Sequence, residues 1–388
     1  MKLKYDHFKF ILSFSLLFTG LLLISLPSKS QIEWTEYPHK LKKEDQEKVK
    51  FGYLSVPENH EEPDSRKSQV AFSILKSQNN SDEAVLYLPG GPGGSFTNNM
   101  NDFLAIGPIQ KILEHKDIVF LDPRGCGNSK PSLCDNLNET EVAYPNIFGR
   151  TEAEMEALLV KAVEECRDAL VAANIDPRAY SSVAVAHDIE LLRKVLGYRQ
   201  WIVRGHSYGS YYGQSLIHHF PGTVKAGILS GLVPKGGIHT RVEFENMTGA
   251  IKKVIEACEK DPACSQNYPD LENRFLEVLD SLNKEPIKIE GFSNEPIMVD
   301  AQVFVLAIFA MIYTKDGMEV LPMLVEMTEQ GNDWIFRPLA QSLLTWPIEN
   351  DMLKIISLND RATFAEPAGS HNYEDSFFQS VYQYCYND

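Results

Sequence analysis

The sequence predicts an α/β fold, in which a mainly parallel sheet carries helices on both faces and an inserted helical lobe. From residue 83 to residue 229, short apolar runs typical of strands alternate with segments whose apolar residues recur at helical spacing. After Pro234 the helical spacing continues to residue 344 without a convincing strand. Strands that alternate with helices usually pair in parallel and are covered on both faces.

The 388 residues are 44% hydrophobic and 23% charged, a composition that allows a large buried core. We expect the core in residues 31–234 and the helical lobe in residues 235–388. Residues 1–30 read as a signal peptide, because lysines precede an apolar run and small residues stand before Gln31. An uncleaved membrane anchor is the alternative, but the run is short for a membrane span. We therefore expect a periplasmic or extracellular protein with no stable membrane span after cleavage.

The charge and the motifs exclude several kinds of partner. Removal of residues 1–30 takes away four lysines and one aspartate, which shifts the formal charge from −16 to −19. Such a surface repels nucleic acid and anionic lipid. We expect no nucleotide, because neither a G-x-G-x-x-G after a strand nor a G-x4-G-K-[ST] is present. The cysteine spacings match no zinc pattern, so we expect no metal and no cofactor.

The first strands lead to a loop rich in glycine. Residues 49–57 and 68–77 are rich in strand-forming residues and flank a polar stretch, which predicts a hairpin. A strand over residues 83–88 then ends in Pro89-Gly-Gly-Pro-Gly-Gly-Ser95. Such a loop exposes backbone N–H groups, and we expect Gly91 to supply one donor of an oxyanion hole. The alternative is a flexible linker, which rarely follows a buried strand directly.

A second turn follows the strand expected at residues 117–121. It reads Asp122-Pro-Arg-Gly-Cys-Gly-Asn-Ser129 and places Asp122 and Arg124 beside glycines. We interpret the turn as structural, holding the loop beneath an active site, with contact to substrate as the alternative. Helices are expected over residues 151–174, which open with a capping box, and over residues 185–196.

The central motif runs from Trp201 to Gly213. An apolar strand is followed by Gly205-His-Ser-Tyr-Gly209 and then by a helix that Pro221 stops. A serine in this turn adopts a strained backbone, and a β-carbon at either glycine would collide with the neighbouring strand or helix. Ser207 is therefore the expected nucleophile, and the N–H of Tyr208 the expected oxyanion donor. A chance turn is the alternative, but the strand and helix on either side argue against it.

The helical lobe contains many Met and Phe residues, such as Phe304, Phe309, Met311 and Met323. We expect these side chains to pack together and not to surround a cofactor.

The chain from Phe51 to Asp388 resembles the α/β-hydrolase fold peptidases of the proline iminopeptidase and tripeptidyl aminopeptidase group. The resemblance rests on the glycine loop, the Asp122 turn and the Ser207 motif, in that order. It implies an exported serine aminopeptidase that cleaves peptides with free N-termini through an acyl-enzyme. An esterase of the same fold, or a truncated protein that only binds peptides, is the alternative.

The resemblance also implies two disulfides, Cys134 with Cys166 and Cys258 with Cys264. Cys126 and Cys385 are left unassigned.

The sequence departs from the family at its C-terminal end. The family continues with two strands that carry the triad aspartate and histidine, and this part of the core is not visible here. Asp360 and His371 follow Ser207 in the right order, but the interval between them is too short for a helix and another strand. His206 belongs to the turn, and its ring should point away. Because a serine without its base is a poor nucleophile, we expect the chain as given to be nearly inactive.

Overall fold

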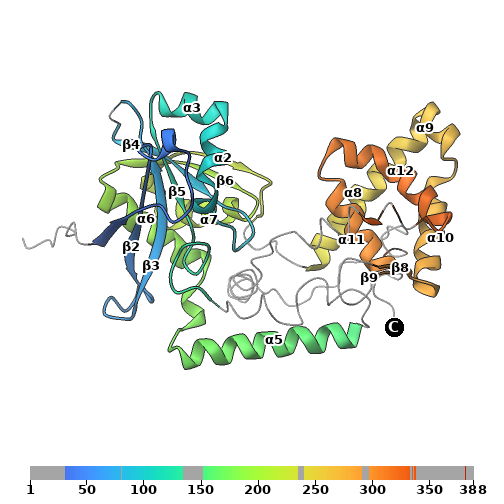
Figure 1. The fold of residues 1–388 in the computed structure, drawn as a ribbon, viewed down its shortest axis with the longest axis horizontal. Helices are drawn as coiled ribbons and strands as arrows, with labels where there is room; N and C mark the ends of the chain where they lie inside the picture. The colour runs from blue at the N-terminus through green and yellow to red at the C-terminus, as the bar shows by residue number, and fades with distance from the viewer. Residues whose placement is uncertain are drawn as a thin grey trace, which may run out of the picture. The chain divides into compact units, whose positions relative to one another are not determined.

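The computed structural model describes residues 31–79, 81–133, 152–234, 240–290, 297–332, 334, 336–337 and 381. The chain divides into two compact units (Figure 1). The first comprises Met1–Gly90, Ser95–Pro131 and Ser182–Ser230, and the second comprises Gly91–Gly94, Ser132–Ser181 and Gly231–Asp388. The expected signal peptide lies outside the described residues. Within the part that is described, no helix is both long and apolar enough to cross a membrane.

A seven-stranded sheet forms the first unit, in the order β1-β2-β3-β5-β4-β6-β7. Neighbouring strands from β5 to β7 pair in parallel, whereas β1, β2, β3 and β5 pair antiparallel. Five of the seven strands, β2 and β4 to β7, therefore run in one direction, which confirms the mainly parallel sheet. The strands are β1 (Ile32–Thr35), β2 (Val49–Pro57), β3 (Lys67–Leu75), β4 (Glu83–Leu88), β5 (Asp117–Leu121), β6 (Gln200–His206) and β7 (Val224–Ser230).

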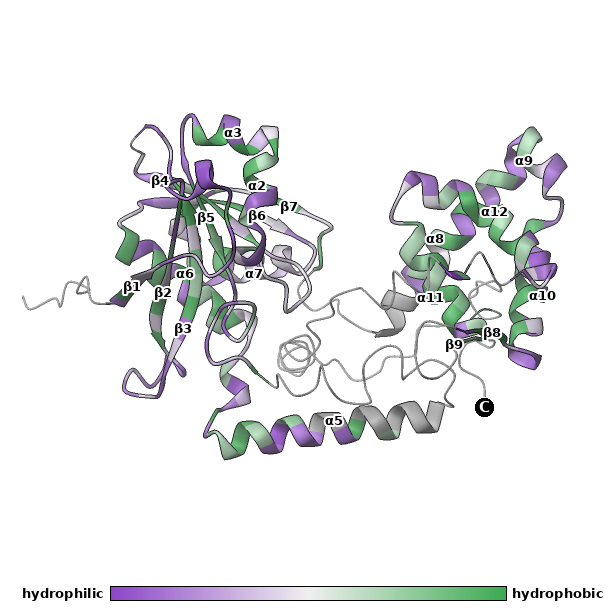
Figure 2. Ribbon diagram, viewed as in Figure 1, coloured by the Kyte–Doolittle hydropathy of each residue, from purple (hydrophilic) through white to green (hydrophobic). Residues whose placement is uncertain are grey.

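Helices cover both faces of this sheet, as the alternating pattern predicted. On one face, α2 (Met100–Ala105) and α3 (Gly107–Leu113) pack against β4 and β5 in a single apolar cluster. On the other face, α7 (Tyr208–His219) approaches β6 and β7, and α6 (Ser182–Leu196) contacts α7. Hydrophobic residues gather in the central strands of this unit (Figure 2). Every residue of β4 and β5 is buried, as expected of strands covered on both faces.

The last strand of the sheet is exposed. Among the described strands, β7 pairs only with β6, and most of its residues are exposed. Ile228 is 57% exposed, although it lies within a strand. Its parallel partner Arg204 points to the same face and is also exposed. The helices of the first unit therefore leave this corner of the sheet uncovered.

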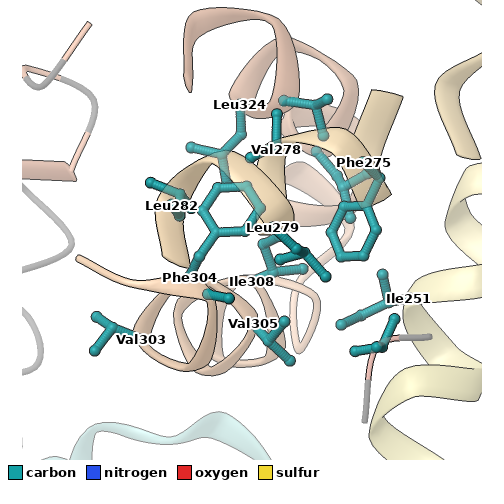
Figure 3. Packing of buried hydrophobic residues seen from close by; sticks show 14 of the residues in the cluster. Ile251, Phe275, Val278, Leu279, Leu282, Val303, Phe304, Val305, Ile308 and Leu324 are labelled. Carbon is teal, nitrogen blue, oxygen red and sulfur yellow. The ribbon is translucent and has the colours of Figure 1, made fainter. Parts of the chain in front are cut away.

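The second unit is mainly helical. Its described elements are α5 (Glu152–Ala172), α8 (Thr240–Lys260), α9 (Pro262–Asn267), α10 (Leu271–Lys284), β8 (Ile287–Ile289), β9 (Ile297–Val299), α11 (Ala301–Met311) and α12 (Lys315–Glu329). The small hairpin of β8 and β9 was not predicted. In Figure 3, Phe275, Val278 and Leu282 of α10 point toward Phe304 and Ile308 of α11. Phe304 is fully buried and Phe309 and Met311 pack against the same cluster, as expected, whereas Met323 is 37% exposed.

The cysteines agree in part with the expected disulfides. Cys258 of α8 is bonded to Cys264 of α9, as predicted. Cys166 is also disulfide-bonded, but its partner lies outside the described residues. Its pairing with Cys134 stays a prediction, because Cys134 is outside them too. Cys126 is buried and is not part of a disulfide, and Cys385 is not described.

A buried carboxylate ties together the amino ends of the parallel strands. Glu83, the first residue of β4, is 3% exposed. Lys116, just before β5, and Lys225 of β7 each place Nζ 2.9 Å from its carboxylate oxygens. Arg199, just before β6, contacts the same carboxylate. Hydrogen bonds from Lys225 and Lys116 lower the pKa of Glu83 from 4.5 to about 2. One side chain therefore holds four neighbouring strands in register.

Replacement of Glu83 by glutamine should make the fold less sensitive to acid. Because the pKa of Glu83 is depressed in the folded protein, its contribution to stability is present above about pH 4.5 and is lost as the pH falls toward 2. The free energy of unfolding of Glu83→Gln should be lower than that of the wild type at pH 7, and the two should converge near pH 2. Urea unfolding between pH 7 and pH 2 measures this. Glu61→Gln, at an exposed position, is the control, and an unchanged pH dependence in Glu83→Gln would refute the assignment.

Candidate active site

Ser207 occupies a strained position between a strand and a helix. β6 ends at His206, α7 begins at Tyr208, and Ser207 between them has φ 53° and ψ −125°. Such a backbone conformation costs about 1–3 kcal/mol in a non-glycine residue and persists only where the surrounding structure imposes it. The N–H of Ser207 donates to the carbonyl of Ser230, 2.9 Å away. Its carbonyl accepts from the N–H and the hydroxyl of Ser210, at 2.9 Å and 2.6 Å. These bonds hold the strained backbone in place.

The two glycines of the motif are required by close backbone contacts. A β-carbon built on Gly205 would lie 2.3 Å from the carbonyl oxygen of Gly209. One built on Gly209 would lie 2.2 Å from the carbonyl oxygen of Leu88, at the end of β4. Neither contact can be relieved by rotation of a side chain, because both partners are backbone. The predicted collisions are thus present, and the turn is pressed against the neighbouring strand.

The glycine loop begins beside the serine, at Gly90. A β-carbon built on Gly90 would lie 3.1 Å from the β-carbon and 3.7 Å from the hydroxyl oxygen of Ser207. Sequence analysis did not single out Gly90, although its place two residues after β4 is the available signal. Gly91 has φ +114°, and a β-carbon on it would lie 2.8 Å from the nitrogen of Gly93. Gly91 groups with the second unit, and its role as an oxyanion donor stays a prediction.

Tyr208 anchors the first turn of α7. Its side chain is 4% exposed and stacks on Tyr211, with ring centroids 5.1 Å apart. Its ring also meets that of Tyr212 edge to face, at 5.2 Å. The packed rings fix the residue whose N–H lies at the amino end of the helix, where the helix dipole favours negative charge. This end of α7 can therefore stabilise an oxyanion that forms on a group attached to Ser207.

The described histidines lie away from the Ser207 hydroxyl. The ring of His206 is exposed, and its Nδ1 lies 3.1 Å from the hydroxyl of Ser230, in line with the expected outward orientation. His218 and His219 end α7 and are exposed. Among the described residues, no histidine ring hydrogen-bonds the Ser207 hydroxyl. Asp360 and His371 lie outside the described residues.

Asp122 and Arg124 are both fully buried, and each has its own partners. The guanidinium of Arg124 binds Asp188 of α6 through Nε at 2.8 Å and Nη2 at 2.6 Å, and it donates to the carbonyl of Glu58 at 2.6 Å. Nε2 of His60 lies 2.8 Å from Oδ1 of Asp188, the oxygen that also accepts from Nη2 of Arg124. Sequence analysis missed this cluster, because its members are far apart in the chain. Arg124 therefore joins α6 to the β2–β3 hairpin, which agrees with the structural role predicted for the turn.

Gly209→Ala should destabilise the fold far more than a matched substitution nearby. The added methyl would overlap the backbone of Leu88, so either β4 or α7 must shift, and overpacking of this kind costs roughly 1–3 kcal/mol or more. Gly222→Ala is the control, because a β-carbon there meets nothing within 4 Å. Thermal and urea unfolding of both variants measure the difference, and equal stabilities would show that the close approach is not a constraint.

The comparisons with known proteins agree with this geometry. The family model for the alpha/beta hydrolase fold matches residues 83–293. Serine protease Hip1 of Mycobacterium tuberculosis is 28% identical over 225 residues, which are 55% of this chain and 42% of that protein. Carboxylesterase B of Mycobacterium tuberculosis is 27% identical over 247 residues, 61% of this chain and 47% of that protein.

Tripeptidyl aminopeptidase of Streptomyces lividans is 26% identical over 192 residues, 48% of this chain and 35% of that protein. The matched part thus spans less than half the length of each of these relatives. The family match itself covers more than half of the chain and includes the parallel strands β4 to β7, the glycine loop and the serine turn. The chain therefore belongs to the α/β hydrolase fold family.

Proposed function

We propose that this protein is an exported serine aminopeptidase of the proline iminopeptidase or tripeptidyl aminopeptidase type, which acts through an acyl-enzyme on Ser207. The observation that carries the proposal is the strained Ser207, half-buried at the junction of β6 and α7. The relatives named serine protease and tripeptidyl aminopeptidase support peptides as substrates. The activity of the whole protein is part of the proposal, because the matched part covers only 42% and 35% of these two relatives.

The reaction would proceed in two steps at the Ser207 hydroxyl. Its oxygen would attack the carbonyl carbon of the peptide bond, and the N–H groups of Tyr208 and Gly91 would donate to the oxygen that gains negative charge. Collapse of this intermediate would break the C–N bond, leave an ester on Ser207 and release the amine with a proton. Water would then hydrolyse the ester.

The general base and its carboxylate partner are not among the described residues. A base is needed because the serine hydroxyl keeps its proton at neutral pH. Asp360 and His371 are the candidates that the chain order Ser, Asp, His allows, although their short interval argues against them.

Export is supported by the lysines and the apolar run of residues 1–30 and by the disulfide chemistry. Cys258 and Cys264 form a disulfide, and Cys166 is also bonded. Disulfides persist in oxidising compartments such as the periplasm or the cell exterior.

An esterase of the same fold is the second candidate. Carboxylesterase B matches 61% of this chain, the largest share among the three relatives described above. An esterase and an aminopeptidase share the acyl-enzyme step. They differ in that only the aminopeptidase recognises a free amino group of its substrate.

Three substrates that share the same tripeptidyl group separate the candidates: its p-nitroanilide with a free N-terminus, the N-acetylated p-nitroanilide and the p-nitrophenyl ester. We expect a tripeptide p-nitroanilide with a free N-terminus to be hydrolysed at least about tenfold faster, as kcat/KM, than its N-acetylated form, since one binding interaction is worth about 1.4 kcal/mol or more. Residues 31–388 are assayed alone and joined to the C-terminal segment of the tripeptidyl aminopeptidase, and we expect the joined protein to be far more active. Ser207→Ala should abolish this turnover in both. Equal rates on the free and acetylated peptides, with rapid hydrolysis of the p-nitrophenyl ester, would favour the esterase.

A further inference from the structure

The Asp122 carboxylate is surrounded by hydrogen-bond donors. Its side chain is fully buried at the end of β5. One oxygen accepts from the N–H groups of Phe96 and Thr97, at 3.0 Å and 3.1 Å. The other accepts from the hydroxyl of Ser95 at 2.9 Å, from the hydroxyl of Thr97, and from the N–H of Asn128 at 3.0 Å. All five donors are neutral, so the carboxylate is held by hydrogen bonds and not by a cation.

Four of these five donors belong to the segment that leaves the glycine loop. Ser95, Phe96 and Thr97 follow Gly94 directly, and Thr97 is fully buried. The loop enters from β4 through Gly90, which lies against Ser207. Both ends of the loop are therefore anchored within the first unit, one beside the serine and the other on Asp122. The four residues between these anchors, Gly91–Gly94, include the residue whose N–H is proposed to face the oxyanion, Gly91.

The turn after β5 is shaped to allow this contact. Gly127 has φ +52°, and a β-carbon on it would lie 2.5 Å from an oxygen of Asp122 and 2.5 Å from the side chain of Ser95. The side chain of Asn128 adds a second connection, because its Nδ2 lies 2.8 Å from the hydroxyl of Thr97. Glycine at 127 thus lets the loop and the carboxylate meet.

A buried charge without a cation is unfavourable unless its hydrogen bonds are complete. Burial raises the pKa of Asp122, and the hydrogen bonds from Thr97, Asn128 and Ser95 act in the opposite direction. An apolar side chain could fill the same space without this penalty, but it could not accept five hydrogen bonds. The arrangement is therefore suited to holding a particular loop conformation.

We propose that Asp122 is a positioning residue, which fixes the segment Ser95–Thr97 and so sets where the N–H groups of the glycine loop lie relative to Ser207. This inference rests on the proposed function and adds a residue that acts on the oxyanion donors without touching substrate. Loss of one oxyanion donor lowers kcat by about 10²–10³-fold, so misplacement of the loop should lower kcat while KM changes little.

Asp122→Asn is the test, because the amide fills the same space but turns an NH2 group toward donors. Asp117→Asn is the matched control, since Asp117 is also buried in β5 but binds Lys76 and Ser77 at the other end of the strand. Both variants are made in residues 31–388 joined to the C-terminal segment of the tripeptidyl aminopeptidase. In this joined protein we expect kcat per folded molecule to fall at least about tenfold in Asp122→Asn, with KM within about twofold, and to stay unchanged in Asp117→Asn. Equal losses of kcat in the two variants would overturn the inference.

Hydrogen exchange provides a readout that does not require turnover. In Asp122→Asn the amides of residues 94–97 should exchange at least about tenfold faster, whereas those of Ser207–Tyr212 keep their protection. A uniform increase, or no increase at residues 94–97, would refute the positioning role. If the joined protein shows no hydrolysis that depends on Ser207, the proposed function fails, and the exchange pattern alone decides whether Asp122 positions the loop.

Discussion

The close approach of two backbones, the end of β4 and the turn between β6 and α7, constrains the rest of the first unit. A β-carbon on Gly205 would lie 2.3 Å from the carbonyl oxygen of Gly209 within the turn itself, and one on Gly209 would lie 2.2 Å from the carbonyl oxygen of Leu88 in β4. This contact brings Gly90 beside Ser207 and makes α7 start directly after the serine. The reactive hydroxyl, the glycine loop and the helix N-terminus thus meet because of packing, before any catalytic interaction is considered.

Two buried acids stabilise opposite ends of the parallel strands in different ways. Glu83 lies at the amino ends and is neutralised by Lys116, Arg199 and Lys225, which come from neighbouring strands or the residues just before them. Asp122 lies at the carboxyl end of β5 and is held by neutral donors from loops. Ion pairs suit the end where strands must stay in register. Hydrogen bonds suit the end where backbone groups need exact positions, since they are directional.

The parts of the fold set by local pattern could be predicted from the sequence. The strand at residues 83–88 was predicted with the bounds that the structure shows, because a continuous apolar run ends at a proline. The serine turn was also predictable, because Gly205 and Gly209 lie only two residues from Ser207 in the sequence. The disulfide between Cys258 and Cys264 lies within a few residues of a helix end and followed from the family resemblance.

Features that depend on tertiary contacts could not be predicted. β1 spans only four residues and is a strand because it pairs with β2. The helices α2 and α3 are too short to show a periodic pattern. Asp188 gave no signal as the partner of Arg124, because 64 positions separate them. The closeness of Gly90 to Ser207 gave no signal either, because composition alone does not show which glycine of the loop lies beside the serine.

The most direct test of the central claim, that Ser207 is the reacting group, is to treat the protein with a fluorophosphonate and to locate the phosphonyl group by mass spectrometry. The serine oxygen would displace fluoride, so the label reports the nucleophile itself. We expect one label, on Ser207, which forms faster when residues 31–388 are joined to a segment that carries a general base, and which is absent from Ser207→Ala. A label on another residue, or equal labelling of the alanine variant, would show that Ser207 is not the reacting group.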